Sequence, residues 1–169
     1  MKKNLTLTGM MGVGKSTVGR GVSKRLLMGF SDIDKIIENK LKMTIQKIFE
    51  KKGEVFFRKI EEKITLEEMK KKNTVISLGG GAFMNSQIKK YVMLNSKSFW
   101  LDLNIQLLEK RLIKSKSRPL LNNLNLKEDL EKIFNKRKNT YAKADYRINC
   151  DKLSRNLIIE KIIKLYANN

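Results

Sequence analysis

The sequence predicts an α/β fold in which a parallel sheet is flanked by helices. Short apolar runs alternate with segments whose apolar residues recur at helical spacing, a pattern typical of strand–helix units. A glycine-rich run also joins the first predicted strand to the first predicted helix. Because 169 residues, 41% of them hydrophobic, suffice for one core but not comfortably for two, we expect a single domain over residues 1–169.

Five strands are expected, each followed by at least one helix. The strands are predicted at Asn4–Thr8, Phe30–Asp32, Thr74–Leu78, Ser98–Leu103 and Tyr146–Cys150. The helices are predicted at Ser16–Met28, Lys35–Leu41, Thr44–Lys51, Glu54–Lys72, Gln87–Met93, Ile105–Lys114, Lys127–Thr140 and Leu153–Ala167. The alternation breaks at residues 115–125, a basic stretch with the only proline, Pro119. We expect a loop here, either a lid over about residues 115–127 or a solvated linker.

Composition argues against several classes of protein. No apolar run approaches the roughly 18 residues of a membrane-spanning helix, and the start of the chain does not resemble a secretory signal. The single cysteine, Cys150, cannot form an internal disulfide and the chain has no histidine, so a reducing cytoplasm fits best. The net charge of +20 raises affinity for polyanions. However, the lysines are spread over helices without an arginine–aromatic cluster, so no specific nucleic-acid partner is expected.

The run Gly9–Thr17 matches the phosphate-binding pattern G-x-x-x-x-G-K-[ST] in full. Between a strand and a helix, such a loop can wrap the phosphates of a nucleoside triphosphate with its backbone N–H groups. Lys15 is then expected to reach the β- and γ-phosphates, and Ser16 to bind Mg²⁺. The alternative is a glycine-rich structural turn. The residues predicted to bind the nucleotide are Gly12, Val13, Gly14, Lys15, Ser16 and Thr17.

Two carboxylates, Asp32 and Asp34, follow the second predicted strand. The carboxyl ends of parallel strands face the ligand crevice, and alternation along the strand sends both side chains the same way. Asp32 is placed to hold Mg²⁺ through water, and Asp34 to accept the proton of an attacking hydroxyl. Alternatively, Asp34 is only the N-cap of the helix that starts at Lys35.

Arg58 and Glu61 stand three residues apart on a predicted helix, with Phe57 beside them. They form a surface ion pair, or Arg58 supplies a planar fork that binds a carboxylate at two points. Arginine is scarce in this lysine-rich chain, and its use at position 58 favours the fork.

Three glycines and two arginines complete the candidate residues. Gly79–Gly81 end the third predicted strand, where they form a plain turn or let a ligand approach the main chain closely. Arg118, in the expected lid, can close over a transferring phosphoryl group. Arg137, with Tyr141 one turn later on the same helix face, can meet a second anionic group. Both arginines are otherwise ordinary surface residues.

Together these motifs resemble the shikimate kinase family, from about Leu5 to the last helix. The resemblance rests on the phosphate loop, Asp32-Ile33-Asp34, Phe57-Arg58 with Glu61, Gly79-Gly80-Gly81, Arg118-Pro119-Leu120-Leu121, and Arg137 with Tyr141. It implies a three-layer P-loop kinase fold with a five-stranded parallel sheet, a substrate-binding region at about residues 33–61, and a monomer. The implied reaction transfers the γ-phosphoryl group of ATP to the 3-hydroxyl of shikimate, on the way to chorismate and the aromatic amino acids.

The resemblance also implies roles for single residues. Asp34 would contact the ring hydroxyls and act as the base, and Arg58 and Arg137 would grip the shikimate carboxylate. Arg118 would touch the phosphates from the lid and, with Lys15, complete the catalytic set. The remaining implied site residues are Glu61, Gly79, Gly80 and Gly81 beside the substrate, Ile45, Phe49 and Phe57 as its apolar wall, and Arg111 and Arg155 beside the adenine.

The sequence departs from the family pattern after Tyr141. Ala142–Asp145 is one residue shorter than usual, which makes the approach to the last strand uncertain. Three other functions stay open at this point: a kinase of the same fold for gluconate or a nucleoside monophosphate, a P-loop ATPase stimulated by nucleic acid, and a nucleotide-binding module without catalysis.

Overall fold

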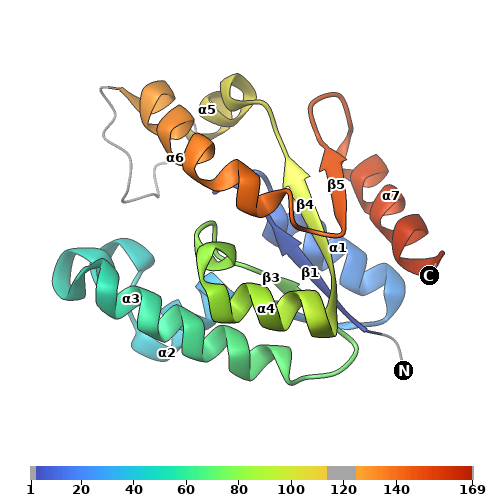
Figure 1. Ribbon diagram of the computed structural model, residues 1–169, viewed down its shortest axis with the longest axis horizontal. Helices are drawn as coiled ribbons and strands as arrows, with labels where there is room; N and C mark the ends of the chain where they lie inside the picture. Colours follow the sequence, from blue (N-terminus) through green and yellow to red (C-terminus); the bar gives the residue numbers. More distant parts are fainter. Residues whose placement is uncertain (1–2, 114–124, 169) are drawn as a thin grey trace.

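The computed structural model describes residues 3–113 and 125–168, and its centre is a five-stranded parallel sheet (Figure 1). The strands are β1 (Asn4–Thr8), β2 (Gly29–Asp32), β3 (Thr74–Ser77), β4 (Ser96–Asp102) and β5 (Tyr146–Asn149). They lie in the order β2-β3-β1-β4-β5, and all neighbouring pairs are parallel. The α/β class and the five strands expected from the sequence are confirmed.

The helices lie close to their predicted positions. They are α1 (Lys15–Leu26), α2 (Ile33–Leu41), α3 (Ile45–Met69), α4 (Ser86–Asn95), α5 (Ile105–Ile113), α6 (Leu126–Tyr141) and α7 (Arg155–Ala167), with a short 3₁₀ helix, η1 (Ala82–Met84), that the sequence did not predict. The two helices predicted on either side of Gly53 form one element, α3, which kinks at Gly53 with φ 78° and ψ 170°. Glycine adopts this positive φ without the strain that a side chain would add.

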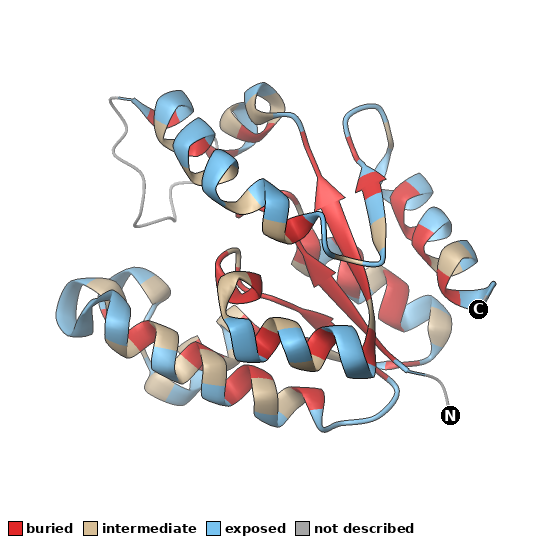
Figure 2. Cartoon of the chain, viewed as in Figure 1, coloured by how far each residue is buried: buried red, intermediate tan, exposed pale blue. Residues whose placement is uncertain are grey.

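Helices cover both faces of the sheet. On one face Leu7 of β1 packs toward α1 at Gly19, and α7 lies beside α1 (Figure 1). On the other face the Trp100 ring of β4 stacks on Tyr141 of α6, and α3 and α4 lie side by side (Figure 1). Figure 2 shows the buried residues concentrated in the strands and on the helix sides that face them. None of the described helices is long and apolar enough to cross a membrane.

Two local predictions are corrected or resolved by the structure. Helix α2 begins at Ile33, and its N-cap is Asp32, whose Oδ1 accepts from the Lys35 backbone N–H at 3.3 Å. The alternative that Asp34 is the cap is therefore wrong. After Tyr141, the chain reaches β5 through Asp145, whose Oδ2 accepts from the Ser98 backbone N–H and hydroxyl, both at 2.7 Å.

Candidate active site

The phosphate loop turns sharply between β1 and α1. Gly9, Gly12 and Gly14 have φ values of 133°, 77° and 101°, a region that favours glycine. At Gly9 a β-carbon would lie 2.4 Å from the Leu101 carbonyl oxygen, so β4 leaves no room for a side chain. The loop and the N-terminus of α1 border a cavity of about 310 Å³, whose lining residues include Gly12, Gly14, Lys15, Ser16, Thr17 and Arg111.

Two cations lie against this loop. Lys15 is buried, and its Nζ donates to the carbonyl oxygens of Gly9 and Met10, both at 2.8 Å. Arg111 of α5 donates from Nη1 to the Val13 carbonyl oxygen at 3.2 Å. Positive charge thus borders the cavity from two sides, in addition to the positive end of the α1 dipole, which makes it suited to an anion.

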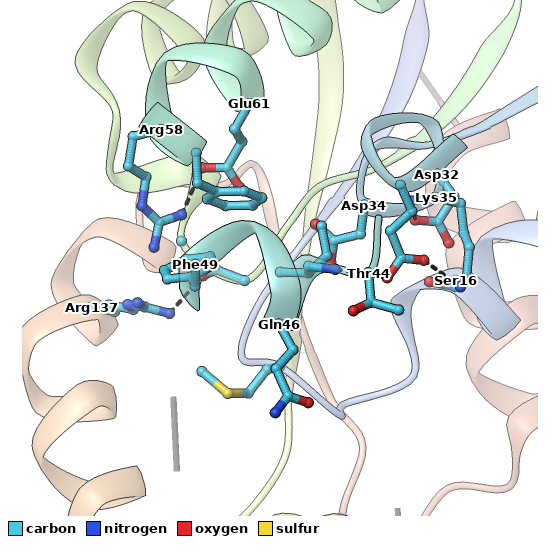
Figure 3. A pocket seen from close by; sticks show the side chains of 16 residues that line it. Ser16, Asp32, Asp34, Lys35, Thr44, Gln46, Phe49, Arg58, Glu61 and Arg137 are labelled. Carbon is cyan, nitrogen blue, oxygen red and sulfur yellow. Dashed lines mark hydrogen bonds and ion pairs between the residues drawn. The ribbon is translucent and has the colours of Figure 1, made fainter. Parts of the chain in front are cut away.

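A second cavity, of about 520 Å³, adjoins the first, because Ser16 and Asp34 line both (Figure 3). Asp32 borders the larger cavity from the end of β2, and Asp34 borders it from the first turn of α2. Both carboxylates lie beside the phosphate loop as expected. Asp34 lies in a helix and not on a strand, so alternation along a strand does not account for its direction.

Arg58 of α3 borders the larger cavity with its guanidinium held by two carboxylates. Nη1 donates to Glu61 Oε2 at 2.7 Å, while Nε and Nη2 donate to Glu54 Oε1 at 3.1 and 3.0 Å. The Glu61 side chain is only 2% exposed. Burial raises the pKa of Glu61 above its usual value, the Arg58 charge and hydrogen bond oppose the rise, and Asp34 adds to it. The predicted ion pair between Arg58 and Glu61 exists, but it lies in the wall of the larger cavity and is not a simple surface pair.

The glycine triplet lets side chains of the site approach the main chain closely. A β-carbon at Gly79 would lie 2.3 Å from Glu61 Oε1 and 2.9 Å from Asp34 Oδ1. A β-carbon at Gly81 would lie 2.6 Å from Arg58 Nη1. The close approach predicted at these glycines is therefore made by the site's own charged groups, which pack against backbone that has no side chains.

Arg137 lines the same cavity from α6, whereas Arg58 lines it from α3 (Figure 3). Its Nη1 donates to the Gly80 carbonyl oxygen at 3.1 Å. The Phe49 and Phe57 rings, with centroids 4.7 Å apart, form an apolar wall together with Ile45. The cavity thus combines two guanidinium groups, carboxylates and an apolar wall, a set suited to a small ring that carries a carboxylate and hydroxyls.

Comparison with known proteins identifies the family of this chain. The family model of shikimate kinase matches residues 11–167. The shikimate kinase of Bartonella quintana is 38% identical over 99% of this chain and 80% of its own length, and that of Sulfurihydrogenibium sp. is 42% identical over 95% and 96%. A solved shikimate kinase from Acinetobacter baumannii in complex with shikimate has a TM-score of 0.94 and 33% identity, and covers 99% of this chain and 94% of that one. The chain belongs to the shikimate kinase family.

Shikimate kinases are ATP-dependent phosphotransferases, and the matches favour this family over the gluconate and nucleoside monophosphate kinases that the sequence left open. Arg118 lies outside the described residues. Arg155 is exposed at the start of α7 and lines neither of the two cavities.

Sequence reasoning missed several residues of the larger cavity. These are Met11, Lys35, Glu38, Thr44 and Gln46. For Met11 and Lys35 a signal was available, because they lie within the phosphate loop and beside Asp34. Thr44 and Gln46 reach the cavity through the turn between α2 and α3, which Glu38 closes by accepting from the Ile45 backbone N–H at 3.1 Å.

Proposed function

We propose that this chain transfers the γ-phosphoryl group of ATP to the 3-hydroxyl of shikimate, with ATP in the phosphate-loop cavity and shikimate in the larger one. The observation that carries the proposal is the junction of the two cavities at Ser16 and Asp34. Donor and acceptor bound on either side of this junction would be held in contact, and positioning supplies much of the catalysis of phosphoryl transfer.

In this proposal shikimate is held by its carboxylate and its hydroxyls. Arg58 and Arg137 bind the carboxylate from α3 and α6. Gly79–Gly81 offer main-chain contacts, and Phe49, Phe57 and Ile45 pack against the ring. Glu61 holds Arg58 in place through their 2.7 Å ion pair. The fork of an arginine matches a carboxylate at two points, which fixes the orientation of the ring as well as its position.

Asp34 is the proposed general base. Its carboxylate accepts the proton of the 3-hydroxyl as that oxygen bonds to the γ-phosphorus and the bond to the ADP oxygen breaks. Lys15 stabilises the charge on the β- and γ-phosphates, and Arg118 is proposed to do so from a lid at about residues 115–127. Arg111 and Arg155 are proposed to border the adenine, and for Arg111 this is supported by its contact with the phosphate loop.

The residues beside the phosphate loop fit Mg²⁺. Ser16 and Asp32 both line the larger cavity, and a hydroxyl with one carboxylate is a donor set that suits an ion held mainly by phosphates and water. Among the described residues, no three or more histidine, cysteine or acidic side chains cluster so that they could hold a metal ion. When bound, Mg²⁺ would neutralise charge on the phosphates between which the bond breaks.

A coupled ADP-release assay tests the proposal. ADP is expected with shikimate as acceptor and not with gluconate, nucleoside monophosphates or DNA. ADP release that is stimulated by DNA and indifferent to shikimate would refute the proposal, as would binding of ATP without any turnover. A cytoplasmic location and a monomeric state belong to the same proposal, and light scattering after gel filtration tests the monomer.

A further inference from the structure

The Gly80 carbonyl oxygen receives two hydrogen bonds from α6. One comes from Arg137 Nη1 at 3.1 Å, and the other comes from the hydroxyl of Tyr141. Gly80 belongs to the turn after β3 that forms one wall of the larger cavity. Two side chains one helical turn apart thus join α6 to this wall.

The Tyr141 ring is fixed by packing. The residue is 0% exposed, and its ring stacks on Trp100 of β4 with centroids 5.9 Å apart. Trp100 also contacts Arg147 of β5, whose guanidinium carbon lies 4.8 Å from the indole centroid. Arg147 is held in turn by Asp102, with Nη2 at 2.6 Å from Oδ2. A side chain held on this many sides presents its hydroxyl at a defined point.

The Tyr141 hydroxyl contacts two parts of the site. Besides the Gly80 carbonyl oxygen, it lies 3.9 Å from the Met10 sulfur in the phosphate loop. It shares the Gly80 carbonyl oxygen as acceptor with Arg137 Nη1. Burial raises the pKa of Tyr141 above its usual value, with Arg137 opposing the rise, so the hydroxyl keeps its proton and remains a donor.

We infer that Tyr141 is a positioning residue for the acceptor, one that fixes the Gly80 peptide and so lets Arg137 turn from it toward the substrate. The inference rests on the proposed function. To bind the substrate carboxylate, Arg137 must turn its N–H groups toward it and away from the Gly80 carbonyl. A carbonyl left without a donor is costly, but the Tyr141 hydroxyl continues to satisfy Gly80 when Arg137 leaves it. Tyr141 therefore lets Arg137 exchange the Gly80 carbonyl for the substrate carboxylate, and it holds the Gly80 peptide in place before the substrate binds.

The test compares Tyr141→Phe with a matched control, Tyr166→Phe. Tyr166 of α7 is also buried, and its hydroxyl donates to the Lys3 carbonyl oxygen at the start of the chain, away from both cavities. Both variants lose one buried hydroxyl that donates to a backbone carbonyl. Tyr141→Phe is expected to raise the shikimate KM about tenfold and to leave the ATP KM within about twofold, whereas Tyr166→Phe changes neither.

A double-mutant cycle with Arg137→Ala tests whether Tyr141 acts through Arg137. On that background Tyr141→Phe is expected to raise the shikimate KM less than about threefold. The inference is overturned if Tyr141→Phe and Tyr166→Phe have the same shikimate KM and lower the Tm equally. It is also overturned if Tyr141→Phe raises the shikimate KM as much on the Arg137→Ala background as in the wild type. Wild-type protein without shikimate-dependent ADP release would instead refute the proposed function, so the two failures are distinct.

Discussion

Replacing Arg58 by lysine tests whether the fork, and not only the charge, holds the acceptor. Arg58 donates three hydrogen bonds to Glu61 and Glu54, and its guanidinium carbon lies 5.2 Å from the Phe57 ring centroid. A lysine ammonium keeps the charge but cannot bond a carboxylate from two parallel N–H groups while it also keeps Glu61 paired. Arg58→Lys therefore removes at least one charged hydrogen bond from the bound state.

The size of the effect follows from the strength of that bond. A hydrogen bond to a charged group contributes about 1.5–3 kcal/mol. Because each 1.4 kcal/mol is a factor of ten, we expect the shikimate KM to rise about 10- to 150-fold. The ATP KM should stay within about twofold, since Arg58 lines the larger cavity and not the phosphate-loop cavity.

The assay is steady-state ADP release with each substrate varied in turn, supported by calorimetric binding of shikimate alone. The matched control is Arg25→Lys, because Arg25 is an exposed arginine of α1 whose Nη1 lies 3.4 Å from Glu160 Oε1. It should change neither KM. Equal increases in both KM values for Arg58→Lys, or a shikimate KM no different from that of Arg25→Lys, would refute the assignment of Arg58.

Three further predictions concern the carboxylates around the acceptor. Asp34→Asn is expected to lower kcat at least about a hundredfold through loss of the base, and unchanged turnover would contradict that role. Glu54→Gln should lower the shikimate KM about two- to fivefold, because Glu54 occupies two N–H groups of Arg58 that the substrate carboxylate needs. A raised shikimate KM would count against this competition between Glu54 and the substrate. Glu160→Gln is the control. Burial raises the pKa of Glu61, so the Glu61 carboxyl of the folded protein binds a proton more tightly than that of the unfolded chain. This tighter binding stabilises the fold at pH values below 4.5, the ordinary glutamate pKa. The stabilisation is lost as the pH rises through the folded-state pKa. Thermal unfolding across pH should thus show the wild type losing stability relative to Glu61→Gln as the pH rises above 4.5, and a relative gain would contradict it.

Local patterns predicted the sheet and the nucleotide half of the site. The strands and helices have strong apolar periodicity, so their positions agree with expectation to within a few residues. The exception is the start of α2, where the sequence offered Asp34 as a candidate N-cap. The helix begins two residues earlier than predicted, and Asp32 caps it.

The acceptor half shows where local reasoning ends. Arg58, the glycine triplet and Arg137 were identified as candidates, but each had an ordinary alternative as a surface residue or a turn. The structure brings them together through contacts between distant positions, such as Arg137 with Gly80, 57 residues apart. Tyr141 was noted only as a neighbour of Arg137, and its contact with the Gly80 carbonyl spans 61 residues.

The sequence by itself determined the phosphate loop, the alternation of strands and helices, and the pairing of Arg58 with Glu61, because each depends on residues that are adjacent or one helical turn apart. Only the tertiary structure decided that Glu61 and Arg58 press against glycine backbone, that Tyr141 satisfies Gly80, and that two cavities meet at Ser16 and Asp34. Those facts depend on how the α3 and α6 helices lie over the carboxyl ends of the strands, and that packing depends on the whole core.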